Sequence, residues 1–176
     1  LPAYLQTKGY VTSSIDSLQY NIESARIVLF IGELYRWAQL DARYIEHPLL
    51  DAIGWRERIF TDKPLDFSQV QSLQEKMLNQ LENTGYPFAK VYLDSLVLDK
   101  DMVSALLKVN KGPLYKIDSI RLYGNAKISN RYLQRYLDIA NGSIYSKGKL
   151  LRINKKISEL VYVEQEQPFN ITMLGT

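Results

Sequence analysis

Several stretches of the chain have the hydrophobic pattern of β-strands. Residues 25–31 form a nearly continuous run of Val, Ile, Leu and Phe, which is typical of a strand buried on both faces. Residues 34–42 alternate instead, so that Trp37 and Leu40 fall on opposite faces of the predicted strand. Turn residues at 21–24 and 98–101 predict two hairpins. The remaining predicted extended segments cover residues 11–18, 89–96, 102–109, 114–123 and 169–174.

Segments with the hydrophobic periodicity of α-helices separate these predicted strands. Residues 68–83 place five apolar side chains on one stripe, with Ser68 as the predicted N-cap. The five are Val70, Leu73, Met77, Leu78 and Leu81. Residues 1–8 have the pattern of the last turns of a helix that Gly9 ends. Further helices are predicted over residues 44–53, which end at Gly54, and over residues 129–139 and 147–160.

The order of these elements repeats along the chain with a period of 76–80 residues. Three landmarks occur twice, namely Gly9-Tyr10 with Gly85-Tyr86, Gly32 and Tyr35 with Gly112 and Tyr115, and Phe67-Ser68 with Tyr145-Ser146. The repeating unit reads strand, helix, helix, strand, strand. The sequence therefore predicts three domains: the C-terminal part of a module at 1–31, a complete module at 32–112, and a partial module at 113–176.

Composition agrees with a chain that folds by packing. Of 176 residues, 46% are hydrophobic and none is Cys, which excludes a disulfide scaffold and a disordered tail. The formal charge of +3 gives no strong field for a polyanion. The apolar run at 27–31 is far shorter than the roughly 18 residues of a membrane-spanning helix. The chain begins at Leu1 without an initiator Met or a signal peptide, so a piece of a longer protein is expected.

No constellation of residues predicts catalysis, a metal or a cofactor. His47 is the only histidine, and with no Cys it cannot build a typical transition-metal site or a catalytic triad. The carboxylates Asp16, Asp94, Asp99, Asp101 and Glu164 are scattered over strands and turns. Thirteen tyrosines could suggest platforms for RNA bases, but they recur at matched repeat positions, which favours a structural role. The basic residues at 147–149 and 152–156 predict a solvated helix face, or one that contacts anionic headgroups.

The repeated motifs resemble those of polypeptide-transport-associated (POTRA) domains in outer-membrane assembly factors of the BamA and TamA type. The resemblance is carried by residues 81–91, which end a helix at Gly85-Tyr86, and by residues 111–117, which contain Gly112 and Tyr115. It continues at Gly124-Asn125 and in the helix lead-in from Gly142 to Tyr145-Ser146. It implies an α/β (α+β) fold of tandem modules, each with a three-stranded mixed sheet covered by two helices.

The resemblance also implies a function. The chain would be a periplasmic segment of an outer-membrane protein of a Gram-negative bacterium, anchored through a C-terminal barrel outside the sequence. It would not be an enzyme, would bind no nucleic acid and would be monomeric as a fragment. Its clients would be unfolded outer-membrane proteins, which add a strand to the first strand of each hairpin. The predicted edge residues are Val11, Ser13, Ile15, Ser17, Ala89, Val91, Leu93 and Ser95.

Two other interpretations remain open for the same chain. Charged residues such as Lys90 and Asp94 could instead blunt these edges, so that no client pairs with them. Alternatively, the chain could be a docking scaffold for accessory proteins of an assembly or secretion complex, with one fixed partner that contacts Tyr35, Trp37 and the helix at 68–83.

Overall fold

The computed structural model describes residues 1–173, and their contacts divide them into two compact units. Leu1–Gln80 and Lys90–Asn110 make the first unit, while Leu81–Ala89 and the chain from Lys111 onward make the second. Helix α3 (Phe67–Asn83) therefore contributes its first turns to one unit and its last residues to the other. Leu174, at the end of the last predicted extended segment, lies outside the described residues.

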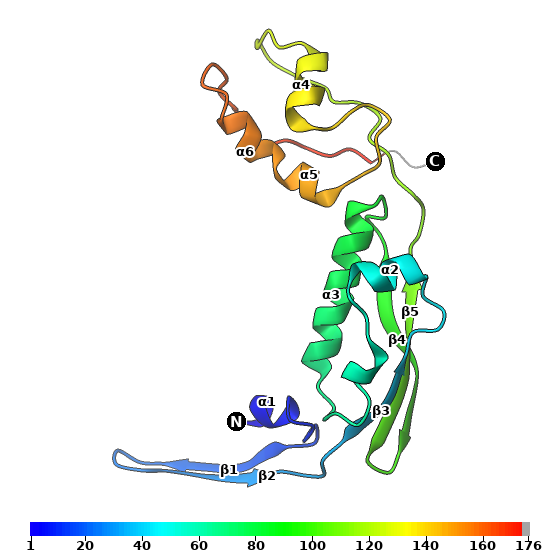
Figure 1. The fold of residues 1–176 in the computed structure, drawn as a ribbon. Coiled ribbons are helices and arrows are strands. Elements are labelled where there is room, and N and C mark those ends of the chain that lie inside the picture. Colours follow the sequence, from blue (N-terminus) through cyan, green and yellow to red (C-terminus); the bar gives the residue numbers. More distant parts are fainter. Residues whose placement is uncertain (174–176) are drawn as a thin grey trace. The chain divides into compact units, whose positions relative to one another are not determined.

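A three-stranded mixed sheet organises the first unit (Figure 1). Its order is β3 (Arg36–Asp41), β5 (Met102–Asn110) and β4 (Lys90–Asp99), in which β3 runs parallel and β4 antiparallel to the central strand β5. Val103, Ala105 and Leu107 of β5 are buried, whereas the residues between them are partly exposed. This period of two shows that one face of the sheet packs on the core and the other meets solvent.

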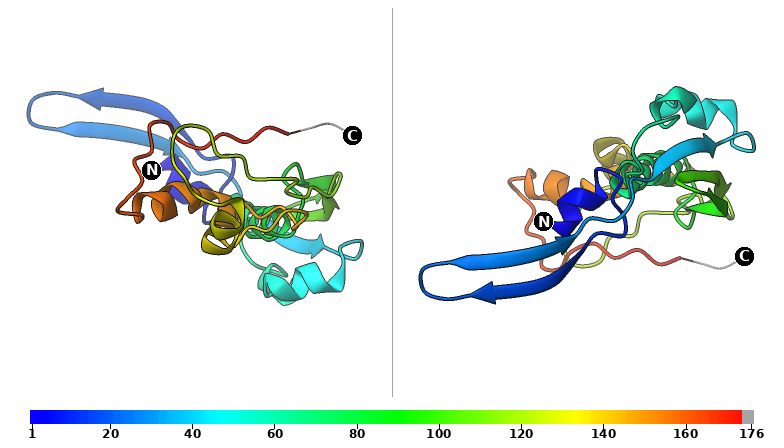
Figure 2. Two further views of the ribbon diagram at one scale, coloured as in Figure 1. Left: turned by 90° about the horizontal axis from the view of Figure 1, so that it is seen from above. Right: turned by 90° about the horizontal axis from the view of Figure 1, so that it is seen from below.

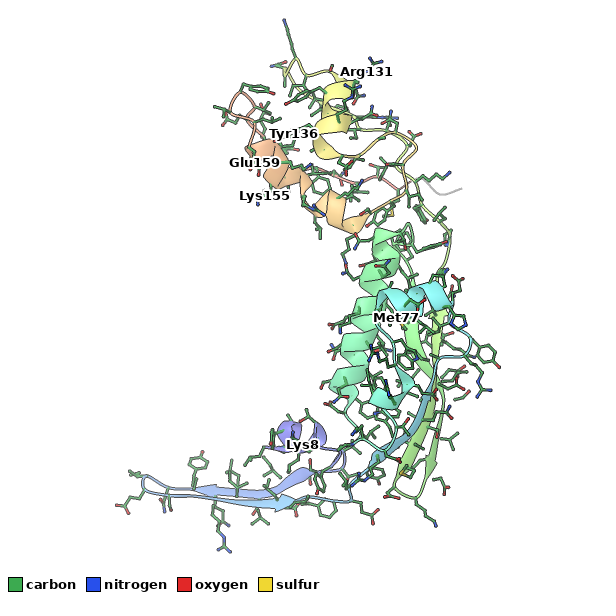
Figure 3. All side chains as sticks on the ribbon, viewed as in Figure 1. Lys8, Met77, Arg131, Tyr136, Lys155 and Glu159 are labelled. Carbon is green, nitrogen blue, oxygen red and sulfur yellow. The ribbon has the colours of Figure 1, made fainter. Side chains whose placement is uncertain are left out.

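Helices cover the buried face of this sheet. In Figure 1 α3 runs alongside the strands, and Figure 2 shows the same helix end-on beside them. Helix α3 places Val70 and Met77 in the core, and Met77 is labelled in Figure 3. Helix α2 (His47–Ala52) adds Leu49 and Leu50, and the short helix η1 (Glu57–Ile59) precedes the buried Phe60. Trp37 is fully buried and makes edge-to-face contacts with the rings of Phe60 and Phe67.

Two local predictions in this unit are wrong. A bulge between Trp37 and Gln39 shifts the register of β3, so Trp37 and Leu40 are both buried rather than on opposite faces. Ser68 is not the N-cap of α3, because the helix already begins at Phe67. The side chain of Asp66 caps it instead, since its carboxylate accepts the N–H of Ser68 at 2.9 Å.

The first hairpin also differs from expectation. It pairs β1 (Ser14–Tyr20) with β2 (Ala25–Phe30), and the short helix α1 (Pro2–Gln6) precedes it. The predicted turn at 21–24 is confirmed, since the Asn21 side chain accepts the N–H groups of Glu23 and Ser24. The predicted burial of residues 25–31 is wrong, because nearly all of them are exposed. Five of the six residues of β2 are exposed, so no layer of the described chain packs on either face of this hairpin strand.

The second unit packs helices on an irregular chain segment. Helices α4 (Asn130–Leu137), α5 (Lys147–Leu151) and α6 (Ile153–Ser158) surround a core that holds four buried residues, namely Leu137, Ile139, Tyr145 and Leu150. The Tyr136 hydroxyl, from a residue labelled in Figure 3, donates to the Lys156 carbonyl at 2.9 Å. The single helix predicted at 147–160 is broken at Arg152. The strand predicted at 114–123 is reduced to one bridge, between Lys116 and Ile144, since no counterpart of β5 pairs with it among the described residues.

The same backbone hydrogen bonds open the complete and the partial module. The Tyr35 N–H donates to the Gly9 carbonyl and the Tyr115 N–H to the Gly85 carbonyl, both at 2.8 Å. The carbonyl of Tyr35 then accepts the N–H of Leu65, two residues before α3, and the carbonyl of Tyr115 accepts the N–H of Tyr145, two residues before α5. The offset of this last pair is 80 residues, so Leu65, and not Phe67, is the counterpart of Tyr145.

Backbone conformation and close packing both require glycine at the end of α3. Gly85 has a φ of +104°, which L residues rarely adopt. A Cβ at this position would lie 2.5 Å from the Leu114 side chain and 2.8 Å from that of Ile144. Gly124 has nearly the same φ, +106°, but open space around its missing Cβ. Substitutions at these two glycines can therefore distinguish the free-energy cost of the backbone conformation from the cost of steric crowding.

We expect Gly85→Ala to destabilise the chain more than Gly124→Ala does. Both substitutions carry a backbone cost of roughly 1–2 kcal/mol. Gly85→Ala adds overpacking of about 1–3 kcal/mol. Urea unfolding of the two variants, followed by circular dichroism, measures the difference. Equal midpoints for the two variants would contradict the close packing around Gly85.

Candidate functional site at the edge of strand β4

Strand β4 is an outer strand of the sheet, so one of its sides has no strand partner. Lys100 and Asp101 form a two-residue turn between the paired residues Asp99 and Met102. Such a turn is closed by a hydrogen-bonded pair, and hydrogen-bonded pairs then alternate along an antiparallel ladder. Counted through the register of β4 and β5, this alternation directs the backbone groups of Val91 and Leu93 toward the free side.

Helix α3 covers part of this free edge. The side-chain amide of Gln74 donates a hydrogen bond to the Val91 carbonyl at 3.2 Å. That bond satisfies one acceptor that an added strand would otherwise use. Leu93 has no such cover from a side chain of the described residues. The edge is thus open at Leu93 and lightly covered at Val91.

A β-bulge limits the length of the edge. The register shifts between Asp94 and Val97, and Ser95 has a φ of +51°. The Ser95 N–H donates to the Asp94 carboxylate at 2.8 Å, and Lys108 of β5 forms an ion pair with the same carboxylate. The hydrogen bond from Lys108 and, to a smaller extent, the one from the Ser95 N–H lower the pKa of Asp94. Because a bulge ends regular pairing, the continuous edge runs only from Lys90 to Asp94.

An apolar surface lies directly beyond the bulge. Leu96, Val97 and Leu98 are 54%, 58% and 54% exposed, although all three are large hydrophobic residues. Val91 and Leu93 are half-buried by comparison. An extended chain that follows β4 would therefore meet backbone groups first and apolar side chains afterwards.

The four residues predicted to form the edge of β4 do not all lie on the regular strand. Val91 and Leu93 lie on the strand, with their backbone groups on its free side. Ala89 precedes the strand, and its N–H donates to the Tyr86 carbonyl at 3.3 Å. Ser95 sits in the bulge. Sequence alternation could not show this, because a bulge changes which backbone groups face outward without changing the pattern of residue types.

The predicted edge of the first hairpin is shorter than residues 11–18. Val11 and Ser13 precede β1, and the buried Ser13 donates its N–H to the Tyr10 carbonyl at 3.1 Å. Ile15 and Ser17 lie on β1, where the register shifts between them. The inclusion of Val11 and Ser13 in an edge strand is therefore wrong.

The burial of Trp37 removes it as a contact for a partner. Its side chain is enclosed by the core, so the docking hypothesis cannot use this residue as an exposed anchor. His47 is exposed at the first position of α2, in agreement with a solvated helix-end residue. Within residues 1–173 no group of acidic and histidine side chains is arranged to hold a metal, and no helix is long and apolar enough to cross a membrane.

Sequence reasoning missed an open hollow of about 290 Å³ on the solvent face of the sheet. The bulges of β3 and β4 lie on either side of β5 at this level. The residues that line the hollow are Gln39, Asp41, Arg43, Tyr44, Ser95, Ser104, Ala105 and Leu106. The Arg43 guanidinium binds the Asp41 carboxylate, and this hydrogen bond lowers the pKa of Asp41. No sequence signal marks the hollow, because it depends on two bulges.

Comparison with known proteins gives a family match for part of the chain. Residues 115–164 match the POTRA family, described as surface antigen variable number repeat. The matched segment contains Tyr115, Gly124-Asn125, Gly142 and Tyr145, which are motif residues predicted above. The resemblance to POTRA domains of BamA-type proteins is thus confirmed. No curated protein matches the chain.

Solved structures extend this similarity over most of the fold. POTRA domains 3–5 of BamA from Haemophilus influenzae align with a TM-score of 0.54 and 18% identity, over 92% of this chain and 67% of that one. BamA from Haemophilus ducreyi lacking POTRA domains 1–3 aligns with a TM-score of 0.51 and 18% identity, over 72% of this chain and 24% of that one. The predicted α+β module with a three-stranded mixed sheet is confirmed.

Proposed function

We propose that the chain is a periplasmic POTRA segment of an outer-membrane protein assembly or translocation factor, and that β4 binds unfolded client proteins by strand addition. The observation that carries the proposal is the free side of β4, where the backbone groups of Val91 and Leu93 have no strand partner. The POTRA match of residues 115–164 supports the setting. The chain acts by binding, without catalysis.

Strand addition suits clients of many sequences. Main-chain N–H and C=O groups are the same in every extended chain, so they give affinity without reading side chains. The alternate side chains of an added strand would lie beside the half-buried Val91 and Leu93. The exposed residues Leu96, Val97 and Leu98 would then add apolar contact past the bulge. Specificity is accordingly low.

The same edge keeps binding weak. Regular pairing is confined to the five residues from Lys90 to Asp94, because the ladder shifts at the bulge. A client must also displace the Gln74 side chain from the Val91 carbonyl. Each net hydrogen bond contributes only about 0.5–1.5 kcal/mol. Such a short ladder favours contacts that form and dissolve quickly, as passage of an unfolded chain requires.

The alternative is a docking scaffold for an accessory protein of the same machinery. The hollow beside β3 favours this alternative, because it offers a fixed shape with an Asp41–Arg43 ion pair at its lining. A scaffold would bind one folded partner and would lose it on substitution of the hollow. Strand addition would instead tolerate such a change and respond to changes at the edge of β4.

A proline on the free side of β4 tests the proposal. Leu93→Pro removes an N–H that faces outward, so the sheet should stay folded while affinity for an extended peptide of alternating apolar residues falls about fivefold or more. Tyr92→Pro is the matched control, since it removes an N–H bonded to β5 and should destabilise the fold. Fluorescence anisotropy with a labelled peptide and thermal unfolding measure the two effects. Unchanged peptide affinity in a folded Leu93→Pro variant would contradict strand addition at β4.

Removal of the helix cover tests the same site in the opposite direction. Gln74→Ala frees the Val91 carbonyl, so client peptides should bind roughly two- to tenfold more tightly. Gln71→Ala is the control, because Gln71 lies on α3 but bonds Glu75 instead of the edge. Isothermal titration of both variants with one peptide makes the comparison. Equal affinity in both variants would show that clients do not use the Val91 carbonyl.

A further inference from the structure

The start of helix α5 lacks the cap that its own sequence would supply. Ser146 occupies the N-cap position, but its side chain accepts no hydrogen bond from the first turn of the helix. The two longer helices are capped by neighbours in sequence, since Asp66 accepts the Ser68 N–H of α3 and Ser129 accepts the Tyr132 N–H of α4. The N–H groups of a first helical turn have no partner within the helix, so an acceptor from another part of the chain can stabilise α5.

That acceptor is Asn83, the last residue of α3. Its side-chain oxygen accepts the N–H of Gly148 at 2.8 Å and the hydroxyl of Ser146 at 3.1 Å. Asn83 stands 65 residues before Gly148, so the cap joins the end of the long helix of one module to a helix of the next. Asn83, Ser146 and Gly148 all belong to the second compact unit.

Glu82 neutralises a positive charge at the start of α5. Lys147 is the first residue of α5, where a positive charge opposes the helix dipole. Its ammonium lies 2.7 Å from the Glu82 carboxylate. The Glu82 hydrogen bond raises the pKa of Lys147, which shows that the pair favours the charged form. Neighbouring residues of α3 thus supply both the acceptor and the counter-charge.

Close packing favours glycine at position 148, although this residue lies inside a helix. A Cβ on Gly148 would lie 2.9 Å from the Asn83 side-chain oxygen, closer than real Cβ atoms approach. Glycine weakens a helix relative to alanine. Glycine at position 148 thus leaves room for the Asn83 oxygen, whereas a Cβ there would require the Asn83 side chain to shift.

We infer that Asn83, a residue distant in sequence, caps α5. The first turn of α5 therefore forms only after the end of α3 has formed. The device links successive repeats in sequence order, because α3 carries its own cap in Asp66 and needs nothing from α5. Formation of the core around Leu150 then follows from the end of α3.

A double-mutant cycle on the full chain tests this inference through hydrogen exchange at the Leu150 and Arg152 amides, which lie in the hydrogen-bonded turns of α5. With Asn83 present, Gly148→Ala should speed exchange, because the Cβ expels the cap. In an Asn83→Ala background, Gly148→Ala should slow exchange roughly two- to fivefold, since alanine is then free to favour the helix. The same sign in both backgrounds would overturn the inference.

Variants of Asn83 alone give a second measurement. Asn83→Leu keeps the size of the side chain but removes the acceptor, so exchange at Leu150 should rise roughly fivefold. Asn83→Asp keeps an acceptor and adds a favourable charge, so protection should be retained or increased. The amide of Met77, in the middle of α3, is the internal control and should not change. Equal protection at Leu150 in the Leu and Asp variants would contradict capping by Asn83.

Discussion

The hydrogen bond from a tyrosine amide to the carbonyl of a helix-ending glycine is the interaction on which the repeat depends. The Tyr35 and Tyr115 amides make it to Gly9 and Gly85 at the same distance, 2.8 Å. A positive φ at each glycine turns the chain out of its helix, and lack of a side chain lets the next segment approach closely. Each module consequently starts from the end of the helix before it, and its sheet and helices are placed from that point.

Much of this architecture follows from the sequence, because Gly-Tyr pairs, turn residues and apolar stripes act locally. The helix at 68–83 and the hairpin around Lys100 could be predicted for that reason. Errors arose where partners are distant or missing. Residues 25–31 have the composition of a buried strand, yet burial needs layers packed on the faces of the strand, and the described chain places none there.

The candidate site was predictable only as a strand. Alternation and hairpin chemistry located β4, but the bulge at Ser95 and the Gln74 hydrogen bond to Val91 decide how much of its edge is open. Both features come from tertiary structure and leave no pattern in residue types. The structure therefore changes the proposed site from a uniform edge of eight residues into a short open segment centred on Leu93, followed by exposed apolar side chains.

The most direct test of strand addition is a backbone-amide NMR titration of the full chain with an extended peptide and with a scrambled peptide of equal composition. Strand addition predicts that both peptides shift the Val91 and Leu93 amides at weak affinity, while Lys90 and Tyr92, whose N–H groups bond to β5, shift less. Shifts confined to the hollow around Tyr44 and Ser104, or no shift along β4 at millimolar peptide, would contradict the account.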